Sequence, residues 1–132
     1  TLTELKEISG QEGDFEATLV QHPRFVDMDK CIACGMCAEK CPKKVINEYD
    51  EGLNKRKAAY IKYPQGVPLK YAIDAENCIY FKNGKCKACE KFCPVDCIDF
   101  TQTEQTAEVN VGAIILAPGI EPFEQAWARD PL

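Results

Sequence analysis

The spacing of the cysteines constrains this chain more than any other feature of its sequence. Eight of its nine cysteines form two runs, Cys31-x2-Cys34-x2-Cys37-x3-Cys41-Pro42 and Cys78-x7-Cys86-x2-Cys89-x3-Cys93-Pro94. Small secreted proteins use dense cysteines for disulfides, but this total is odd and the first residues show no basic stretch followed by an apolar core, so we expect no signal peptide. In a reduced chain, such cysteines indicate a metal site or catalysis.

The first run has the spacing C-x2-C-x2-C-x3-C-P of bacterial iron–sulfur proteins, in which the fourth cysteine binds the other cluster. We therefore predict two [4Fe–4S] clusters that exchange their fourth ligands. The first cluster is assigned to Cys31, Cys34, Cys37 and Cys93. The second is assigned to Cys78, Cys86, Cys89 and Cys41. Two C-x2-C pairs in each run could instead form tetrahedral zinc sites, but three evenly spaced cysteines followed by Cys-Pro favour iron–sulfur.

The two runs belong to an internal repeat. Residues 26–32 match residues 73–79 at an offset of 47, whereas residues 34–42 match residues 86–94 at an offset of 52. The difference is a five-residue insertion within 80–85, where Asn83-Gly84 predicts a turn. We predict an α+β fold, a ferredoxin-like βαβ unit repeated with pseudo-two-fold symmetry. It spans residues 24–101, with a longer insertion at 49–70 between its halves.

Cys97 lies outside both runs. Its counterpart in the first repeat is Val45, so we predict a small buried apolar side chain at this position. An alternative ligand or a redox-active thiol is the other interpretation. No residue is predicted to be catalytic.

Charge is uneven along the chain. Residues 30–91 hold 13 basic and 7 acidic side chains, whereas the flanks hold 3 and 14, for a net charge of −5. An acidic chain argues against nucleic acid as a partner. Because coordinating thiols are deprotonated, the basic middle is expected to balance two negative clusters. The run Lys55-Arg56-Lys57 lies farther from the cysteines and is interpreted as a solvated turn or as a docking site for an acidic redox partner. No span of a membrane is expected, because the longest uncharged run has 12 residues, 109–120, and a spanning helix needs about 20.

The two ends of the chain differ from its middle. Residues 3–9 and 15–21 alternate in polarity and predict a hairpin. Residues 109–119 are almost continuously apolar and end in Pro118-Gly119. A strand that is apolar on both faces is typical of a buried parallel sheet, so this strand is predicted to belong to a larger α/β core outside this chain. An edge strand packed on the ferredoxin unit is the alternative.

Several segments together resemble the family of heterodisulfide reductase A subunits. They are residues 24–27, the first cysteine run, residues 55–68 of the insertion and Gly112-Ala113-Ile114-Ile115-Leu116-Ala117-Pro118-Gly119. The resemblance implies a two-cluster ferredoxin domain inserted within an FAD-binding flavoprotein. Residues 1–23 would be strands leaving that flavoprotein, and residues 102–132 would contain the strand that re-enters its FAD domain. The chain lacks a Gly-rich flavin fingerprint, so FAD is expected only in the parent protein.

The same resemblance implies an anaerobic, cytoplasmic complex. Its members would be the FAD domain of the parent chain, other heterodisulfide reductase subunits and a hydrogenase or formate dehydrogenase. In such a complex the chain is expected to relay single electrons and to catalyse nothing alone. A free-standing two-cluster ferredoxin and a metal-stabilised docking domain without a redox role are the alternatives. The x7 spacing of the second run departs from a simple ferredoxin.

Overall fold

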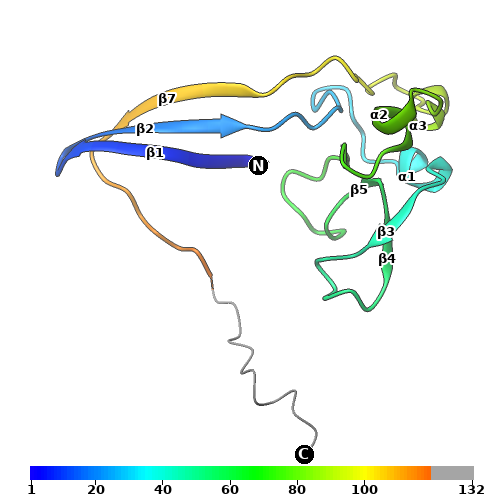
Figure 1. Ribbon diagram of the computed structural model, residues 1–132, viewed down its shortest axis with the longest axis horizontal. Helices are drawn as coiled ribbons and strands as arrows, with labels where there is room; N and C mark the ends of the chain where they lie inside the picture. The colour runs from blue at the N-terminus through cyan, green and yellow to red at the C-terminus, as the bar shows by residue number, and fades with distance from the viewer. Residues whose placement is uncertain (120–132) are drawn as a thin grey trace, which may run out of the picture.

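The computed structural model describes residues 1–119, which form a sheet and a cysteine-bearing unit at one end of it (Figure 1). The sheet contains β1 (Thr3–Gln11), β2 (Asp14–Gln21) and β7 (Gln105–Val111), antiparallel and in the order β1-β2-β7. The predicted hairpin at the start of the chain is confirmed. The ends of the sheet nearest the unit carry the two connections, which leave β2 and enter β7 side by side.

The cysteine-bearing unit, residues 22–104, is built from short elements. These are α1 (Met36–Lys40), β3 (Lys44–Ile46), β4 (Lys55–Lys57), β5 (Ala59–Tyr60), β6 (Ala72–Ile73), α2 (Ile79–Asn83) and α3 (Ala88–Lys91). The mixture of short strands and helices confirms the α+β class. Among residues 1–119, no helix has the length and apolar character needed to cross a membrane.

Backbone hydrogen bonds join the start of the first repeat to the end of the second. Val26 and Ile98 form an antiparallel bridge. On either side of it, the Asp27 N–H donates to the carbonyl of Cys97 over 2.7 Å and the Asp99 N–H donates to the carbonyl of Phe25 over 3.0 Å. The unit is therefore closed on this side by segments that lie about 70 residues apart.

On the other side of the unit, the end of the first repeat does not pair with the start of the second. Both pair with strands of the 49–70 insertion instead. Strand β5 of the insertion pairs with β6, which leads into the second cysteine run. Strand β3, which leaves the first run, pairs instead with β4 of the insertion. The insertion thus contributes strands to the core of the unit.

The core of the unit is small and rich in sulfur. Val26 is its most completely enclosed large side chain, at 2 % exposure. Half of the ten fully buried side chains in this cluster are cysteines, namely Cys31, Cys37, Cys78, Cys89 and Cys97. Since apolar burial is limited, we expect bound metal to supply much of the folding free energy.

The strand expected at 109–119 differs in the structure. Strand β7 ends at Val111, and residues 112–119 have no regular structure, with Ile115 92 % and Leu116 79 % exposed. Val111 lies opposite Phe15, near the first residue of β2, so no partner strand continues beyond it. Residues 109–111 therefore lie in the antiparallel sheet, and the prediction that the apolar run belongs to a larger core outside this chain stays a prediction. The rest of the 102–132 segment, from residue 120, lies outside the described residues.

Candidate metal centres

The first cysteine run winds around a left-handed turn into helix α1. Gly35 precedes the helix with φ of +85°, a conformation that glycine adopts at little cost. This turn leaves Cys34 exposed and buries Cys37 on the helix. Cys31 is buried, and its N–H donates to the carbonyl of Asp27 over 3.0 Å. Cys41 follows the last helical residue in an extended conformation, so the chain carries it away from the other three.

The second run repeats this arrangement with one addition. The Cys78 N–H donates to the carbonyl of Asp74 over 2.9 Å, as Cys31 does to Asp27. Cys89 is buried on α3, and Cys86 and Cys93 are half-buried. The x7 spacing is occupied by helix α2, which Gly84 ends with φ of +71°. The predicted turn is therefore the end of a helix that was not predicted.

Helix α2 carries aromatic side chains onto the core of the unit. The Phe81 ring lies 4.5 Å from Phe25, and the Tyr80 ring lies 4.3 Å from Phe100, both measured between centroids. Tyr80 and Phe100 pack against the buried cysteine-rich core. The five extra residues thus add an aromatic cover that a run with x2 spacing has no room to supply.

Cysteines from both runs line one cavity. It is bounded by Cys41 of the first run and by Cys78, Cys86 and Cys89 of the second. The other lining residues include apolar side chains of the insertion and of α2, namely Ala58, Ala59 and Ile79. Helices α1 and α3 lie against each other, which brings the end of the first run to the second. The structure therefore gathers the four cysteines assigned to one cluster.

The remaining predicted ligands lie beside Tyr71 and Cys97. Burial raises the pKa of Tyr71, and the nearby thiols of Cys37, Cys34 and Cys31 raise it further, so this ring lies beside all three. Cys93 contacts Cys97, with their Sγ atoms 3.4 Å apart and the Cys97 N–H donating to Cys93 Sγ over 3.4 Å. Cys97 also faces Cys31, so it lies between Cys93 and the first run. Its burial fits the predicted small apolar position, and its contact with Cys93 was not foreseen.

Burial controls the protonation of the cysteines. It raises the pKa of Cys37 to about 12 and that of Cys89 to about 11, with smaller increases from neighbouring thiols. The pKa of Cys93 moves the other way: burial opposes the shift, but hydrogen bonds from the backbone of Cys97 and its neighbours outweigh it. Metal binding has to displace the thiol protons of Cys37 and Cys89.

The donor set fits iron–sulfur clusters. Four of the eight cysteines in the two runs surround a cavity whose other walls are largely apolar. Within residues 1–119, no three His, Cys, Asp or Glu side chains are arranged to hold a single metal ion. Iron–sulfur clusters are bound by sites of four cysteines. A cavity whose donor groups are all thiols suits such a cluster.

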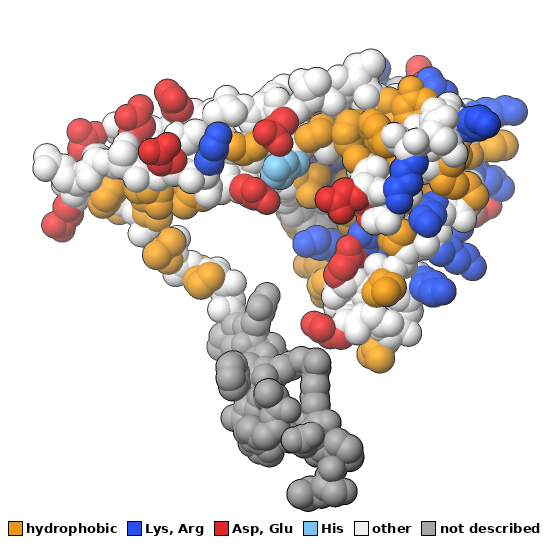
Figure 2. Space-filling view, viewed as in Figure 1, with side chains coloured by type: hydrophobic (Ala, Val, Ile, Leu, Met, Phe, Trp, Pro, Cys, Tyr) orange, Lys and Arg blue, Asp and Glu red, His pale blue; other side chains and the backbone are white. Residues whose placement is uncertain are grey.

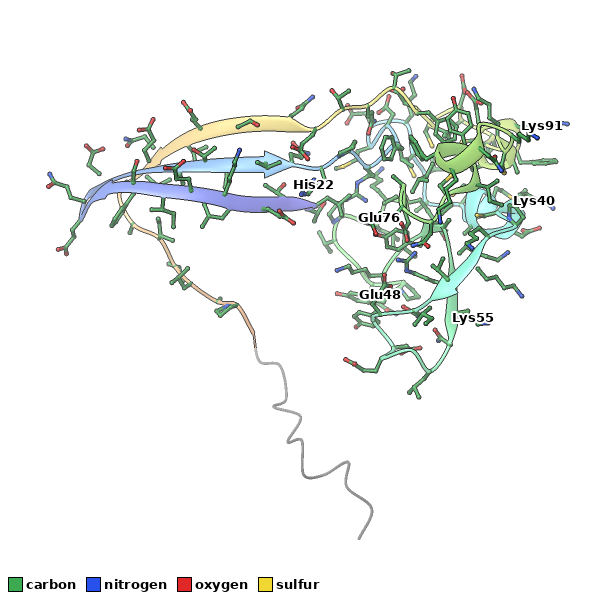
Figure 3. All side chains as sticks on the ribbon, viewed as in Figure 1. His22, Lys40, Glu48, Lys55, Glu76 and Lys91 are labelled. Atoms are coloured by element: carbon green, nitrogen blue, oxygen red, sulfur yellow. The ribbon has the colours of Figure 1, made fainter. Side chains whose placement is uncertain are left out.

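Charge is divided between the two parts of the molecule. Lys and Arg gather over the cysteine-bearing unit, and Asp and Glu predominate over the sheet on the face shown in Figure 2. Lys40 and Lys91 lie at the end of the unit farthest from the sheet (Figure 3). Both Nζ atoms lie within 6 Å of the Phe92 ring centroid. Positive charge is therefore concentrated over the cysteine-bearing unit, as expected from the sequence.

Arg56 ties the insertion to the second run. Its guanidinium donates to Glu48 over 2.7 Å and to Asp74 over 3.0 Å, and lies 4.1 Å from the Tyr60 centroid. Asp74 in turn accepts from the backbone and side-chain N–H groups of Asn77, next to Cys78. The run Lys55-Arg56-Lys57 thus forms a strand of the two-stranded β3–β4 sheet and not a solvated turn, and Lys55 is its one exposed residue.

The hydrogen bond from Arg56 lowers the pKa of Glu48 to about 2. Because the folded-state pKa lies below the ordinary value of 4.5, the stabilisation by Glu48 is present above about pH 4.5. It is lost as the pH falls through about 2. The Glu48 side chain is 69 % exposed, so solvent screens this contribution.

Arg56→Gln is expected to lower the free energy of unfolding by about 2–3 kcal/mol, because it leaves Asp74 half-buried without its cation. Glu48→Gln removes the exposed partner and should cost less than about 1 kcal/mol. Chemical denaturation of the metal-loaded variants measures both. Equal losses in the two variants would contradict the expectation that the Arg56–Asp74 pair stabilises the fold more than the Arg56–Glu48 pair.

Gly35→Ala is expected to destabilise the first run. The alanine has to adopt a left-handed backbone conformation, which costs about 1–2 kcal/mol. Its Cβ would also lie 3.2 Å from Tyr71 Oη. Gly84→Ala is the matched control, since φ is also positive there but no atom lies within 4 Å of the new Cβ. Iron release at a fixed temperature should be faster in Gly35→Ala than in Gly84→Ala. Equal rates would mean that the contact with Tyr71 has no effect.

The side chains that support the cysteine loops were not predicted. Asp27 and Asp74 accept backbone N–H groups two or three residues later and hold the turns before Cys31 and Cys78. They occupy the same position of the internal repeat, at the offset of 47, so the repeat itself carried this signal. The contact of Tyr71 with Gly35 joins distant segments and has no local signal.

Two matches to known families cover the cysteine runs. The description 4Fe-4S binding domain applies to both, one matching residues 24–47 and the other residues 75–96. The chain therefore contains two iron–sulfur binding repeats, as its spacing predicted.

Longer matches cover nearly the whole chain. It is 42 % identical to the iron-sulfur A subunit of the CoB–CoM heterodisulfide reductase of Methanocaldococcus jannaschii. It is 46 % identical to an iron-sulfur A subunit of the same enzyme in Methanopyrus kandleri, and 44 % identical to the A subunit of the H2/formate:CoB-CoM heterodisulfide, ferredoxin reductase of Methanococcus maripaludis. Each match covers 94 % of this chain and 18 % of the relative, so the chain spans about a fifth of their length.

Proposed function

We propose that this chain, which is homologous over 94 % of its length to heterodisulfide reductase A subunits, is the two-cluster electron-transfer module of such a protein. The resemblance found in its sequence is confirmed by these relatives. Two [4Fe–4S] clusters lie side by side in the module and relay single electrons within a larger oxidoreductase. The module performs no catalysis alone.

The ligand sets follow the exchange between the two runs. Cys31, Cys34, Cys37 and Cys93 hold the first cluster, and Cys78, Cys86, Cys89 and Cys41 hold the second. The observation that carries this proposal is the cavity that Cys41 shares with the second run. The contact of Cys93 with Cys97, which faces Cys31, supports the reciprocal half. Exchange brings two clusters close together, as electron relay requires.

When bound, the clusters supply one-electron redox chemistry at potentials set by hydrogen bonds to sulfur and by solvent exposure. The chain controls both factors. The Cys97 N–H donates to Cys93 Sγ, and the α2 aromatics cover the core against water. Cys34 is exposed, so the first cluster is the one more open to a partner. We further propose that the halves are related by a pseudo-two-fold axis, supported by the matching Asp27–Cys31 and Asp74–Cys78 hydrogen bonds.

The sheet connects the module to its parent protein. The register of β1, β2 and β7 places Leu5, Phe15, Leu19 and Val109 on one face, where Leu5 is 46 % and Val109 37 % exposed. Large exposed apolar faces mark interaction sites. We propose that this face packs against the FAD-binding part of the parent, which favours an inserted module over a free-standing ferredoxin. FAD itself binds outside this chain.

The wider setting rests on homology. In a cytoplasmic complex the module would exchange electrons with the flavin of the parent, with other heterodisulfide reductase subunits and with a hydrogenase or formate dehydrogenase. A pull-down from the anaerobic source with the full-length parent protein tests these partners by mass spectrometry. Recovery of the parent without any redox subunit would contradict the proposed setting.

Anaerobic reconstitution followed by iron and sulfide analysis tests the module itself. We expect about eight irons and eight acid-labile sulfides per chain. Low-temperature EPR of the dithionite-reduced protein should show two clusters that interact magnetically. Zinc without sulfide, or one isolated cluster signal at full iron loading, would overturn the proposal.

A further inference from the structure

One lysine of the 49–70 insertion contacts each cysteine run. Lys57 Nζ donates to the carbonyl oxygen of Cys41 over 2.5 Å. Lys70 Nζ donates to the carbonyl oxygen of Cys31 over 2.5 Å. Both residues are half-buried, whereas Lys55 and Lys62 of the same insertion are exposed. Figure 3 shows Lys55 at the outer edge of β4.

The two lysines serve different cysteine groups. Cys41 lines the cavity with Cys78, Cys86 and Cys89, so Lys57 lies beside the group assigned to the second cluster. Cys31 belongs to the other group, so Lys70 lies beside the first. One insertion therefore places a single positive charge against each group of thiols.

The backbone around both lysines is held in place. Lys57 pairs with Lys44 across the β3–β4 ladder. The guanidinium of Arg24 donates to the carbonyl of Lys70 over 3.0 Å and to that of Tyr71 over 3.4 Å. Each lysine therefore starts from a hydrogen-bonded backbone, and its ammonium group donates to the carbonyl oxygen of a cysteine.

Neither ammonium group is neutralised by a carboxylate in the part of the chain that the structure describes, residues 1–119, where the ion pairs involve other lysines. A partly buried cation without an anion is costly. A carbonyl oxygen satisfies one donor but not the charge. An anionic group beside each cysteine run would offset this cost, and four thiolates around an iron–sulfide core form such a group.

We propose that Lys57 and Lys70 are tuning residues, each of which raises the reduction potential of one cluster. The proposal rests on the function proposed above. Reduction adds one electron and no proton, so the negative charge beside the ammonium group grows by one. A nearby cation stabilises the more negative state more strongly. Lys57 therefore tunes the cluster of Cys41, Cys78, Cys86 and Cys89, and Lys70 tunes the other.

The test is an EPR-monitored redox titration of the metal-loaded chain with dithionite and mediators. Lys57→Gln should lower the midpoint potential of one cluster, and Lys70→Gln that of the other. At a fixed potential, the ratio of reduced to oxidised cluster should fall about threefold to tenfold, where tenfold corresponds to 59 mV for one electron. The residual EPR spectra of Cys34→Ala and Cys89→Ala identify which cluster has shifted.

Matched variants separate charge from loop anchoring. Lys55→Gln and Lys62→Gln remove exposed charges of the same insertion and should leave both potentials unchanged. Lys57→Arg and Lys70→Arg keep the charge and should stay close to the unmodified chain. If a Gln variant loads fewer than eight irons, the corresponding Met variant, which keeps a long stem, replaces it. Loss of iron in both neutral variants would make the lysine a loop anchor and overturn the proposal.

The remaining outcomes distinguish this proposal from the function on which it rests. Full iron loading with unchanged potentials overturns the tuning role and leaves the electron-transfer function standing. Equal shifts of both midpoint potentials in either variant also overturn the assignment of one lysine to each cluster. They would mean that the charge of the insertion acts on both clusters alike. Absence of clusters from the unmodified chain overturns both proposals.

Discussion

Cys41→Ala is expected to remove the four-iron cluster of the opposite run and to leave the cluster of its own run intact. The reason is the cavity that Cys41 shares with Cys78, Cys86 and Cys89. Iron and sulfide should fall from about eight to about four per chain. The EPR spectrum that remains should match that of Cys89→Ala and differ from that of Cys34→Ala.

Cys93→Ala provides the reciprocal measurement. Its remaining spectrum should match that of Cys34→Ala, because Cys93 is assigned to the first cluster. Cys97→Ala is the control, since it removes a buried sulfur next to Cys93 without removing a proposed ligand, and it should keep about eight irons. A Cys41→Ala spectrum identical to that of Cys34→Ala would show that the runs do not exchange ligands.

Removal of the clusters is expected to unfold the cysteine-bearing unit. Half of its fully buried core side chains are cysteines, and several of these thiols would become free groups around an empty cavity. When metal ligation supplies folding free energy, its loss appears as loss of the fold. Amide hydrogen exchange before and after anaerobic chelation measures this directly.

The most informative amides close the unit. Those of Asp27, Ile73, Asp74 and Asp99 donate hydrogen bonds between distant segments, so their protection should fall by orders of magnitude on metal removal. Amides of the β2–β7 ladder, where β2 pairs with β7 from Phe15 to Gln21, serve as an internal reference and should change little. Persistent protection of Asp27 and Asp99 after complete iron loss would show that apolar packing is enough to hold the unit.

The sequence predicted the parts of this molecule that depend on local spacing. Three-residue intervals between cysteines identify the iron–sulfur loops, because the chemistry of the ligands dictates the spacing. The internal repeat predicted the α+β unit, and alternation of polarity predicted the hairpin of β1 and β2. These features depend on residues that are close in the chain.

Features that depend on long-range contacts were missed. Nothing near Lys57 or Lys70 in the sequence indicates that they reach Cys41 and Cys31. Nothing near Arg56 in the sequence indicates that it pairs with Asp74, which lies 18 residues later. Of the apolar run at 109–119, only residues 109–111 lie in a strand of this chain, because β2 supplies no partner beyond Val111.

The two connections between sheet and unit leave the sheet at neighbouring points. Gln21 at the end of β2 lies directly opposite Gln105 at the start of β7, about 5 Å away across the ladder. A host strand pair could therefore be rejoined by a short hairpin turn after loss of residues 22–104, with no movement of its remaining strands. The whole electron relay therefore occupies the place of one turn in the sheet.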